Sequence, residues 1–215
     1  MKIKRVAWST FLLTSENITV LTDPVLLTNV GLTLPKSKVD ICLFSNYPSK
    51  IQTSVLEDTK LTNKIVPDKR ESVMEISTPG EFEVGGLMIR RGIEDKFFII
   101  DEKTVRVVYM GGTDNTFDPN SVKDLGDVDV LILPVGDGVN FMDFDTVEKV
   151  ISNIDPAILI PCAYKEEGVK NATVKTKEEF IQHFGFGNVR EESYLNINKK
   201  SVEEDQKSVE VIFLT

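Results

Sequence analysis

The side chains that most often carry catalysis are scarce in this chain of 215 residues. It has one histidine, His183, in a segment predicted to be a helix, beside Phe180 and Phe184. A site built from several imidazoles is therefore excluded. A serine-histidine-aspartate arrangement is not expected either, because the one histidine lies on this helix and away from the ends of the predicted strands. The two cysteines, Cys42 and Cys162, stand alone within apolar runs, which favours buried reduced thiols over a disulfide.

Oxygen-bearing side chains gather in one stretch, at Asp137, Asn140, Asp143 and Asp145. Their spacing is not that of an EF-hand loop, and a helix N-terminus accounts for the last two. The Gly-Asp-Gly turn at residues 136–138 lacks both the spacing of a dinucleotide fingerprint and the lysine of a Walker motif. The sequence therefore predicts neither a calcium loop nor a nucleotide site here.

Composition is that of a soluble globular protein, with 41% hydrophobic and 27% charged residues. The net charge of −9 and the absence of a basic face argue against a nucleic-acid partner. No apolar run reaches the roughly 18 residues of a membrane span. The apolar start is broken by Ser9 and Thr10, so it predicts a strand and not a signal peptide. We expect a cytoplasmic protein without a membrane partner.

Residues 125–165 predict the unit around which the rest is organised. Residues 128–134 form an apolar run that is too short for a helix and rich in β-branched residues, which predicts a strand buried on both faces. Asp143 is the N-cap candidate of a helix that ends before Pro156, and residues 157–160 predict a second buried strand. In such a unit both strands open on one edge of the sheet, where α/β folds keep their sites.

The other segments predict strands in the first half and further strands and helices in the second. Strands are predicted at residues 3–6, 10–14, 18–22, 39–44, 64–66, 73–76, 81–84, 87–93, 97–100, 105–110, 194–197 and 209–214. We expect a hairpin at Gly85-Gly86, a capping box formed by Thr176 and Glu179, and a loop over residues 28–38. The prediction is an α/β fold, a four-layer αββα sandwich of two mixed β-sheets flanked by helices, in a single domain over 1–215.

The order of these segments resembles the metallo-β-lactamase fold. The matching pieces are FLLTSENITVLTDPVL, VDICLFSNYPSK, TPGEFEVGG, VRVVYMGG, LGDVDVLILPVG and ILIPCAYK. They are most similar to the stand-alone metal-dependent hydrolases of the ascorbate-lactonase-like branch. The resemblance lies in turn chemistry and strand order, and it extends from Trp8 to Leu214.

The resemblance also identifies the positions of the family's metal ligands. In such enzymes the strand matching residues 39–44 ends in a His-x-His-x-Asp-His turn, which holds one or two zinc ions that turn water into hydroxide. In this chain the four ligand positions of the turn hold Ser45, Tyr47, Ser49 and Lys50. The family's bridging aspartate corresponds to Gly112, and its last histidine corresponds to Ala163. The resemblance therefore implies that the metal-ligand motif has been lost, with no metal or other cofactor bound.

Five polar residues near these positions are candidates for a binding site. They follow neighbouring predicted strands, so we expect them to line one shallow cleft: Asp23, Tyr47, Lys50, Asp114 and Tyr164. Lys50 could supply the charge of the missing metal and pair with Asp23 or Asp114. A solvated loop lysine and a turn aspartate are the competing interpretations. Asp23 matches an Asp-Pro pair to which the resemblance gives a structural role.

Two functions remain open at this stage. The first is a catalytically inactive protein that binds a protein partner, a small ligand or a second copy of itself at the former active-site face. The alternative is a hydrolase of lactone or phosphodiester type with a non-standard ligand set, for example Cys162 with carboxylates, although an extended segment would direct Cys162 away from Ala163. The simultaneous loss of all placed ligands favours the first function, since a fold alone does not confer an activity.

Overall fold

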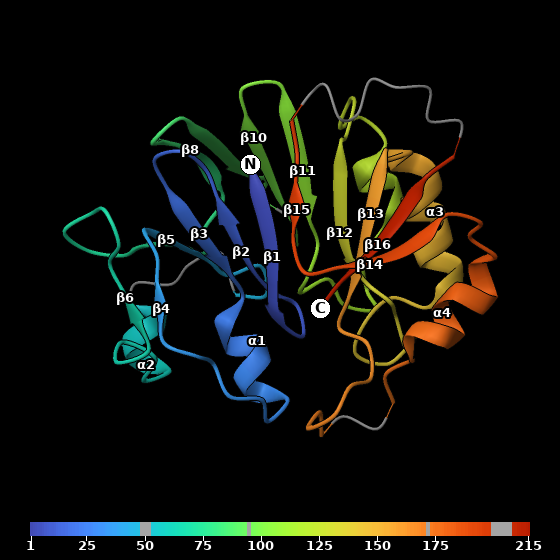
Figure 1. Cartoon of the computed structure of the whole chain (residues 1–215), viewed down its shortest axis with the longest axis horizontal. Coiled ribbons are helices and arrows are strands. Elements are labelled where there is room, and N and C mark those ends of the chain that lie inside the picture. The colour runs from blue at the N-terminus through green and yellow to red at the C-terminus, as the bar shows by residue number, and fades with distance from the viewer. Residues whose placement is uncertain (48–52, 94–95, 171–172, 199–207) are drawn as a thin grey trace.

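The structure is a computed structural model that describes residues 1–47, 53–93, 96–170, 173–198 and 208–215. Two large mixed sheets form the centre of the molecule, and helices lie beside each sheet on the outside (Figure 1). The predicted α/β class, with two sheets flanked by helices, is confirmed.

The six-stranded sheet has the order β15-β1-β2-β3-β5-β7. Its strands are β1 (Lys2–Ala7), β2 (Thr10–Thr14), β3 (Thr19–Thr22), β5 (Ile41–Leu43), β7 (Met74–Ile76) and β15 (Leu195–Asn196). The first three match predicted strands and form an antiparallel meander, whereas β3, β5 and β7 run parallel. Helices α1 (Pro24–Asn29) and α2 (Val55–Asp58) lie on this side of the molecule, with the small pair β4 (Ser37–Lys38) and β6 (Ile65–Val66) (Figure 1).

The eight-stranded sheet has the order β14-β16-β13-β12-β11-β10-β9-β8. Its strands are β8 (Gly80–Val84), β9 (Leu87–Arg91), β10 (Phe98–Glu102), β11 (Val105–Tyr109), β12 (Val130–Pro134), β13 (Ile158–Cys162), β14 (Val189–Glu192) and β16 (Glu210–Leu214). The predicted parallel pair is β12 and β13, with Leu131 opposite Leu159. Helices α3 (Phe144–Ile154) and α4 (Lys177–Phe184) lie beside this sheet, and the short 3₁₀ helix η1 spans Pro119–Val122 (Figure 1).

Two apolar clusters cover the two faces of the eight-stranded sheet. Because side chains alternate along a strand, Ile132 packs with the cluster between the sheets, while Leu131 and Leu133 pack with the cluster that contains Val147 of α3 and Phe180 of α4. Every residue of β12 and β13 is buried. This explains why both strands have nearly continuous apolar sequences.

Both predicted helix starts are confirmed. The Asp143 carboxylate accepts a hydrogen bond from the Thr146 amide, and α3 ends at Ile154, followed by the C-cap Asp155, which has a left-handed backbone. In α4, Thr176 and Glu179 form the complete capping box. These signals are local in sequence, so they could be read without the fold.

One prediction of local structure was wrong in part, and one strand was missed. The stretch expected to be a loop after the third strand begins within α1, since Pro24 takes the first helical position, where its missing amide hydrogen is not needed. Strand β14 was not predicted because its sequence, VREE, is polar; it lies at the edge of the sheet, where such residues reach water.

Cys42 and Cys162 are both buried and free, as predicted. Within the described ranges, every helix is too short or too polar to traverse a lipid bilayer.

Candidate functional site

Four strands of the two sheets bring their carboxyl ends to one edge of the molecule. Asp23 follows β3, Ser45 lies just beyond β5, Tyr109 ends β11 and Ala163 follows β13. Strands β3 and β5 are parallel in one sheet, and β11, β12 and β13 are parallel in the other. Because the carboxyl ends of parallel strands meet at one edge, these residues converge from distant parts of the sequence.

Asp23 is the centre of a buried hydrogen-bond network at this edge. Its Oδ1 accepts from the Ser45 amide at 2.7 Å, and its Oδ2 accepts from the Ser45 hydroxyl and, at 2.7 Å, from the Tyr109 phenol. The same phenol oxygen lies 2.7 Å from the Ser9 carbonyl oxygen. All four residues are buried. The network therefore joins the six-stranded sheet to the eight-stranded sheet through Tyr109.

Burial raises the pKa of Asp23 above its ordinary value, although the hydrogen bonds from Ser45 and Tyr109 and the charge of Arg91 oppose the rise. Burial, followed by the nearby Asp23, also raises the pKa of Tyr109 well above its ordinary value. Both groups are closed off from solvent, with Asp23 only 2% exposed. A substrate would have no direct contact with either group.

Arg91, at the end of β9, is a second polar link at the same edge. Its guanidinium donates to the carbonyl oxygens of Phe44, Ser77, Ser45 and Tyr47 at 3.1, 2.5, 3.0 and 3.2 Å. Sequence reasoning missed Arg91, Tyr109 and the role of Ser45 as a partner of Asp23. The available signals were an arginine inside an alternating strand and a tyrosine at a strand tip before two glycines.

Three of the six non-glycine residues with a left-handed backbone in the described part of the chain lie at this edge. Trp8, Asp23 and Ala163 have left-handed φ values of 54°, 40° and 52°, which side chains with a Cβ atom rarely adopt. The Ala163 amide lies 3.4 Å from the Trp8 carbonyl oxygen. Strain of this kind persists where the surrounding structure holds it, and it is most common at functional sites.

Replacing Ala163 with glycine is expected to stabilise the protein by about 0.5–1 kcal/mol. Glycine removes roughly 1–2 kcal/mol of left-handed strain from the folded state. It also raises the conformational entropy of the unfolded chain, which offsets part of this gain. Urea denaturation of the wild type and the variant measures the difference. A clear loss of stability would show that the Ala163 methyl group contributes more than the strain removes.

Tyr47, one of the predicted site residues, does lie close to the network. Its ring is half-buried and packs edge-on against Phe44, with 5.6 Å between ring centroids. Burial, followed by the charge of Asp23, raises the pKa of Tyr47. The structure thus brings Tyr47 and Asp23 together. Lys50, predicted to belong to the same turn, lies outside the described residues.

Asp114 forms an ion pair with Lys96, at 2.8 and 2.7 Å from the two carboxylate oxygens. It also accepts hydrogen bonds from the amide and hydroxyl of Thr116. Burial raises the pKa of Asp114, but the bonds from Lys96 and Thr116 outweigh it and leave the pKa below its ordinary value. These contacts fit the competing interpretation, in which Asp114 is a turn residue and not part of a binding site.

Tyr164 is separated from the other predicted residues. The residue is 2% exposed and packs with the cluster on the helix side of the eight-stranded sheet, whereas Tyr47 packs against the cluster between the sheets. The left-handed Ala163 interrupts the alternation of side chains, so that Cys162 and Ala163 both pack between the sheets and Tyr164 turns to the other side. The expectation that Cys162 and Ala163 point apart, which assumed an extended segment, was therefore wrong.

Tyr164 lines its own pocket, of about 510 Å³, together with Arg5, Glu166, Lys177 and Glu191. The Arg5 guanidinium lies 4.5 Å from the ring centroid and pairs with Glu166, while Lys177 pairs with Glu191. Burial raises the pKa of Tyr164 to about 12. Asp23, Tyr47 and Asp114, the other predicted site residues that the structure describes, do not line this pocket, so Tyr164 does not share it with them.

The side chains that the structure describes at this edge do not fit a zinc or iron ion. In the described part of the chain, no three histidine, cysteine, aspartate or glutamate residues form a group that could hold a metal. The Ser45 hydroxyl is engaged by Asp23, and a Cβ atom added at Gly112 would lie 2.3 Å from that hydroxyl oxygen. The space that a ligand side chain at residue 112 would need is already filled.

The other polar residues singled out in the sequence have structural partners. Asp137 accepts hydrogen bonds from the amides of Val139, Asn140 and Phe141, which closes its turn. The ring of His183 is exposed and lies 4.4 Å from that of Phe144. Neither residue is placed for catalysis.

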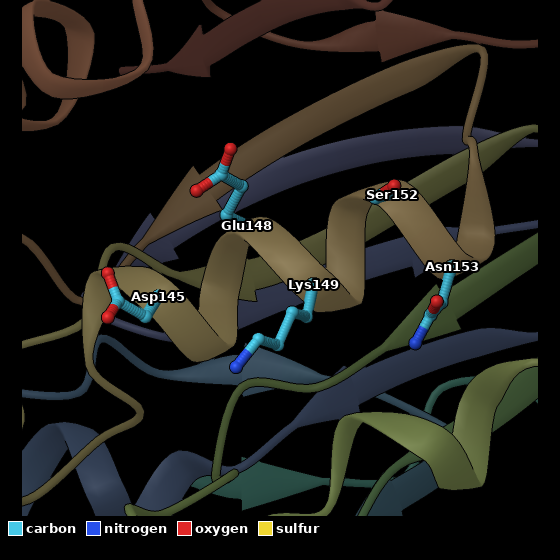
Figure 2. A pocket seen from close by; sticks show the side chains of 5 residues that line it. All are labelled: Asp145, Glu148, Lys149, Ser152 and Asn153. Carbon is cyan, nitrogen blue, oxygen red and sulfur yellow. The ribbon is translucent and has the colours of Figure 1, made fainter.

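A shallow pocket of about 370 Å³ lies along the solvent side of α3. Figure 2 shows its five lining residues, which are Asp145, Glu148, Lys149, Ser152 and Asn153. Their side chains spread along the helix and do not converge on one point (Figure 2). This pocket has no arrangement that could do chemistry.

Most of the chain matches the model of a known protein family. The family model of the beta-lactamase superfamily domain matches residues 2–163. A comparison with curated proteins gives no match.

Solved structures share the fold. A protein described as a Zn-dependent hydrolase of the metallo-β-lactamase superfamily from Thermotoga maritima has a TM-score of 0.71 and 21% identity, and the match covers 100% of this chain and 98% of that one. The metallo hydrolase Igni18 from Ignicoccus hospitalis has a TM-score of 0.59 and 17% identity, covering 86% and 90%. The diiron β-hydroxylase CmlA from Streptomyces venezuelae has a TM-score of 0.60 and 12% identity, covering 99% and 53%. At these identities the likeness establishes the fold alone.

Proposed function

This chain belongs to the beta-lactamase superfamily, and from that premise we propose that it is a catalytically inactive member that acts by binding. Its partner is a protein, a small ligand or a second copy of the chain, held at the former active-site face beside Tyr47. Within the superfamily we place it near the ascorbate-lactonase-like branch, as a single domain without the metal-ligand motif.

The observation that carries this proposal is the bonding of Ser45. In the alignment suggested by the sequence, Ser45 stands where the family has its first histidine ligand. Its amide and hydroxyl are both used by Asp23, and Tyr109 completes the same network. A metal ion at this position would need to break a set of buried hydrogen bonds that satisfy one another.

The half-buried ring of Tyr47 supports binding as the activity of this face. Tyrosine offers a large apolar area with a polar tip, which suits an interface. The Tyr47 carbonyl is held by Arg91, so the backbone that carries the ring is fixed before a partner arrives. A segment whose backbone is already fixed loses less conformational entropy on binding than a mobile one.

We expect the purified protein to contain no stoichiometric zinc, manganese or iron. The physical reason is the donor set at the edge, where hydroxyl and phenol groups replace imidazole and carboxylate ligands. Elemental analysis after purification without chelator provides the measurement, followed by zinc titration of the protein. About one metal per chain, or lactone or phosphodiester hydrolysis that depends on added metal, would favour the alternative hydrolase.

Replacing Tyr47 with alanine is expected to weaken partner capture at least tenfold while lowering the free energy of unfolding by only about 1 kcal/mol. The measurement is affinity purification of the tagged chain, with quantification of the protein that co-purifies with the wild type and of the homo-oligomer. A second variant adds Lys50→Glu, which was predicted to act with Tyr47.

The matched control for this experiment is Tyr194→Ala, because Tyr194 is a 44% exposed tyrosine that contacts Lys2 near β15, at a different edge. Capture should survive this change. Equal capture by the wild type and the Tyr47 variant would contradict the proposed role of this face.

A further inference from the structure

Arg91 connects the two sheets at the edge that carries the candidate site. It belongs to β9 of the eight-stranded sheet, and its acceptors lie in the segments that follow β5 and β7 of the six-stranded sheet. Two of these carbonyls, those of Ser45 and Tyr47, belong to the turn itself. A single side chain therefore fixes the turn to a strand of the opposite sheet.

The chemistry of the guanidinium suits this task. It is planar and always charged, and it presents several donors in fixed directions, so it can bind several carbonyl oxygens at once. Arg91 is 8% exposed, and its guanidinium lies 5.5 Å from the centroid of the Phe98 ring. Burying such a charge is unfavourable unless its donors are satisfied. The carbonyl oxygens of the turn and of Ser77 accept hydrogen bonds from both terminal nitrogens of the guanidinium.

We propose that Arg91 is a positioning residue that clamps the two sheets together at this edge and fixes the turn at residues 44–47, so that Tyr47 is held in place on the binding face. In the family resemblance, the ligand positions follow β5, β11 and β13, so a metal there would join both sheets. Arg91 supplies a link between the sheets without a metal. Only the last step, the consequence for Tyr47, rests on the proposed function.

The test compares Arg91→Met and Arg91→Lys with the wild type by amide hydrogen exchange. The reporters are the Phe44 amide, bonded to the Ile76 carbonyl, and the Ser45 amide, bonded to Asp23. In both variants we expect these two amides to exchange at least tenfold faster, since hydrogen bonds to a charged group are lost and lysine cannot reproduce the planar fork. Amides of β12 and β13 should keep their rates. Uniform acceleration across the chain, or none at the turn, would overturn the proposal.

The neighbouring arginine is the matched control. Arg90 lies on the same strand but pairs with Asp101, because successive residues of a strand face opposite ways. Arg90→Met should leave exchange at Phe44 and Ser45 within about twofold of the wild type, as expected for a partly exposed ion pair. Accelerated exchange at the turn in this control as well would mean that the effect is not specific to Arg91, and it would count against the proposal.

Rescue with free guanidinium separates positioning from general stability. Arg91→Gly should leave room for a guanidinium ion, and millimolar guanidinium chloride should slow turn exchange again, whereas equal sodium chloride should not. If this variant does not fold, Arg91→Met still decides the outcome. Exchange is measured without any partner, so it tests the clamp separately from capture. If the wild type captures no partner but the turn amides exchange faster in the Arg91 variants, the role of Arg91 is supported and the proposed function is wrong. If the wild type captures a partner through Tyr47 but exchange at the turn is unchanged in the Arg91 variants, Tyr47 remains a binding residue and Arg91 has no positioning role.

Discussion

Replacing Asp23 with alanine is expected to lower the free energy of unfolding by about 3–5 kcal/mol, because buried donors that lose their acceptor each cost roughly 1–3 kcal/mol. The Ser45 amide, the Ser45 hydroxyl and the Tyr109 phenol all point to the Asp23 carboxyl group, and all are buried. Urea denaturation with a two-state fit measures the loss. Asp114→Ala is the control, since it removes a partly exposed carboxylate that pairs with Lys96 and should cost no more than about 1 kcal/mol. Similar losses in the two variants would show that the Asp23 network adds little.

Comparing the wild type with Asp23→Asn measures how the contribution of the Asp23 carboxyl group to stability depends on pH. The folded-state pKa of Asp23 is raised above its value of 3.8, chiefly by burial. A raised folded-state pKa means that the contribution of Asp23 to stability is complete below pH 3.8 and is lost as the pH rises through the folded-state pKa. Asparagine does not titrate. The stability advantage of the wild type over Asp23→Asn should therefore shrink as the pH rises from about 4, by at most about 1.4 kcal/mol per pH unit. An advantage that grows with pH would mean that the folded-state pKa is lowered.

Placing aspartate at residue 112, where the resemblance puts a metal-bridging carboxylate, is expected to destabilise the protein by more than about 3 kcal/mol and to create no metal site. A Cβ atom at Gly112 would lie 2.3 Å from the Ser45 Oγ and 3.0 Å from the Asn46 Cβ. Overpacking of this kind costs roughly 1–3 kcal/mol, and a second buried carboxyl group beside Asp23 adds to the loss. Thermal unfolding with and without zinc measures both effects.

Gly187→Asp is the control for the change at Gly112. An added Cβ atom at Gly187 meets nothing within 4 Å, so the same substitution should change stability by only about 0.5 kcal/mol. Zinc-dependent stabilisation of the Gly112 variant would show that the turn can still accept a metal, and it would weaken the proposal that the site has been rebuilt.

The sequence by itself determined the layered α/β fold. The buried pair β12 and β13, the Asp143 cap and the Thr176–Glu179 capping box were all read correctly. These features depend on apolar periodicity and on hydrogen bonds between residues close in sequence, so no knowledge of the fold was needed. The sequence also excludes a site of several imidazoles in any fold of this chain, because it has a single histidine.

Only the tertiary structure decided how the candidate site is made. The partners Asp23 and Tyr109 are 86 residues apart, and Arg91 binds carbonyls of residues more than 40 positions earlier, which no local pattern encodes. The prediction that Tyr164 shares a cleft with Tyr47 was based on loops that follow neighbouring strands, and it did not consider the direction of each side chain. The left-handed backbone of Ala163 breaks the alternation of side chains at the end of β13, so that Tyr164 packs on the helix side of the sheet. The pairing of remote strands imposes this conformation, which alanine does not favour by itself.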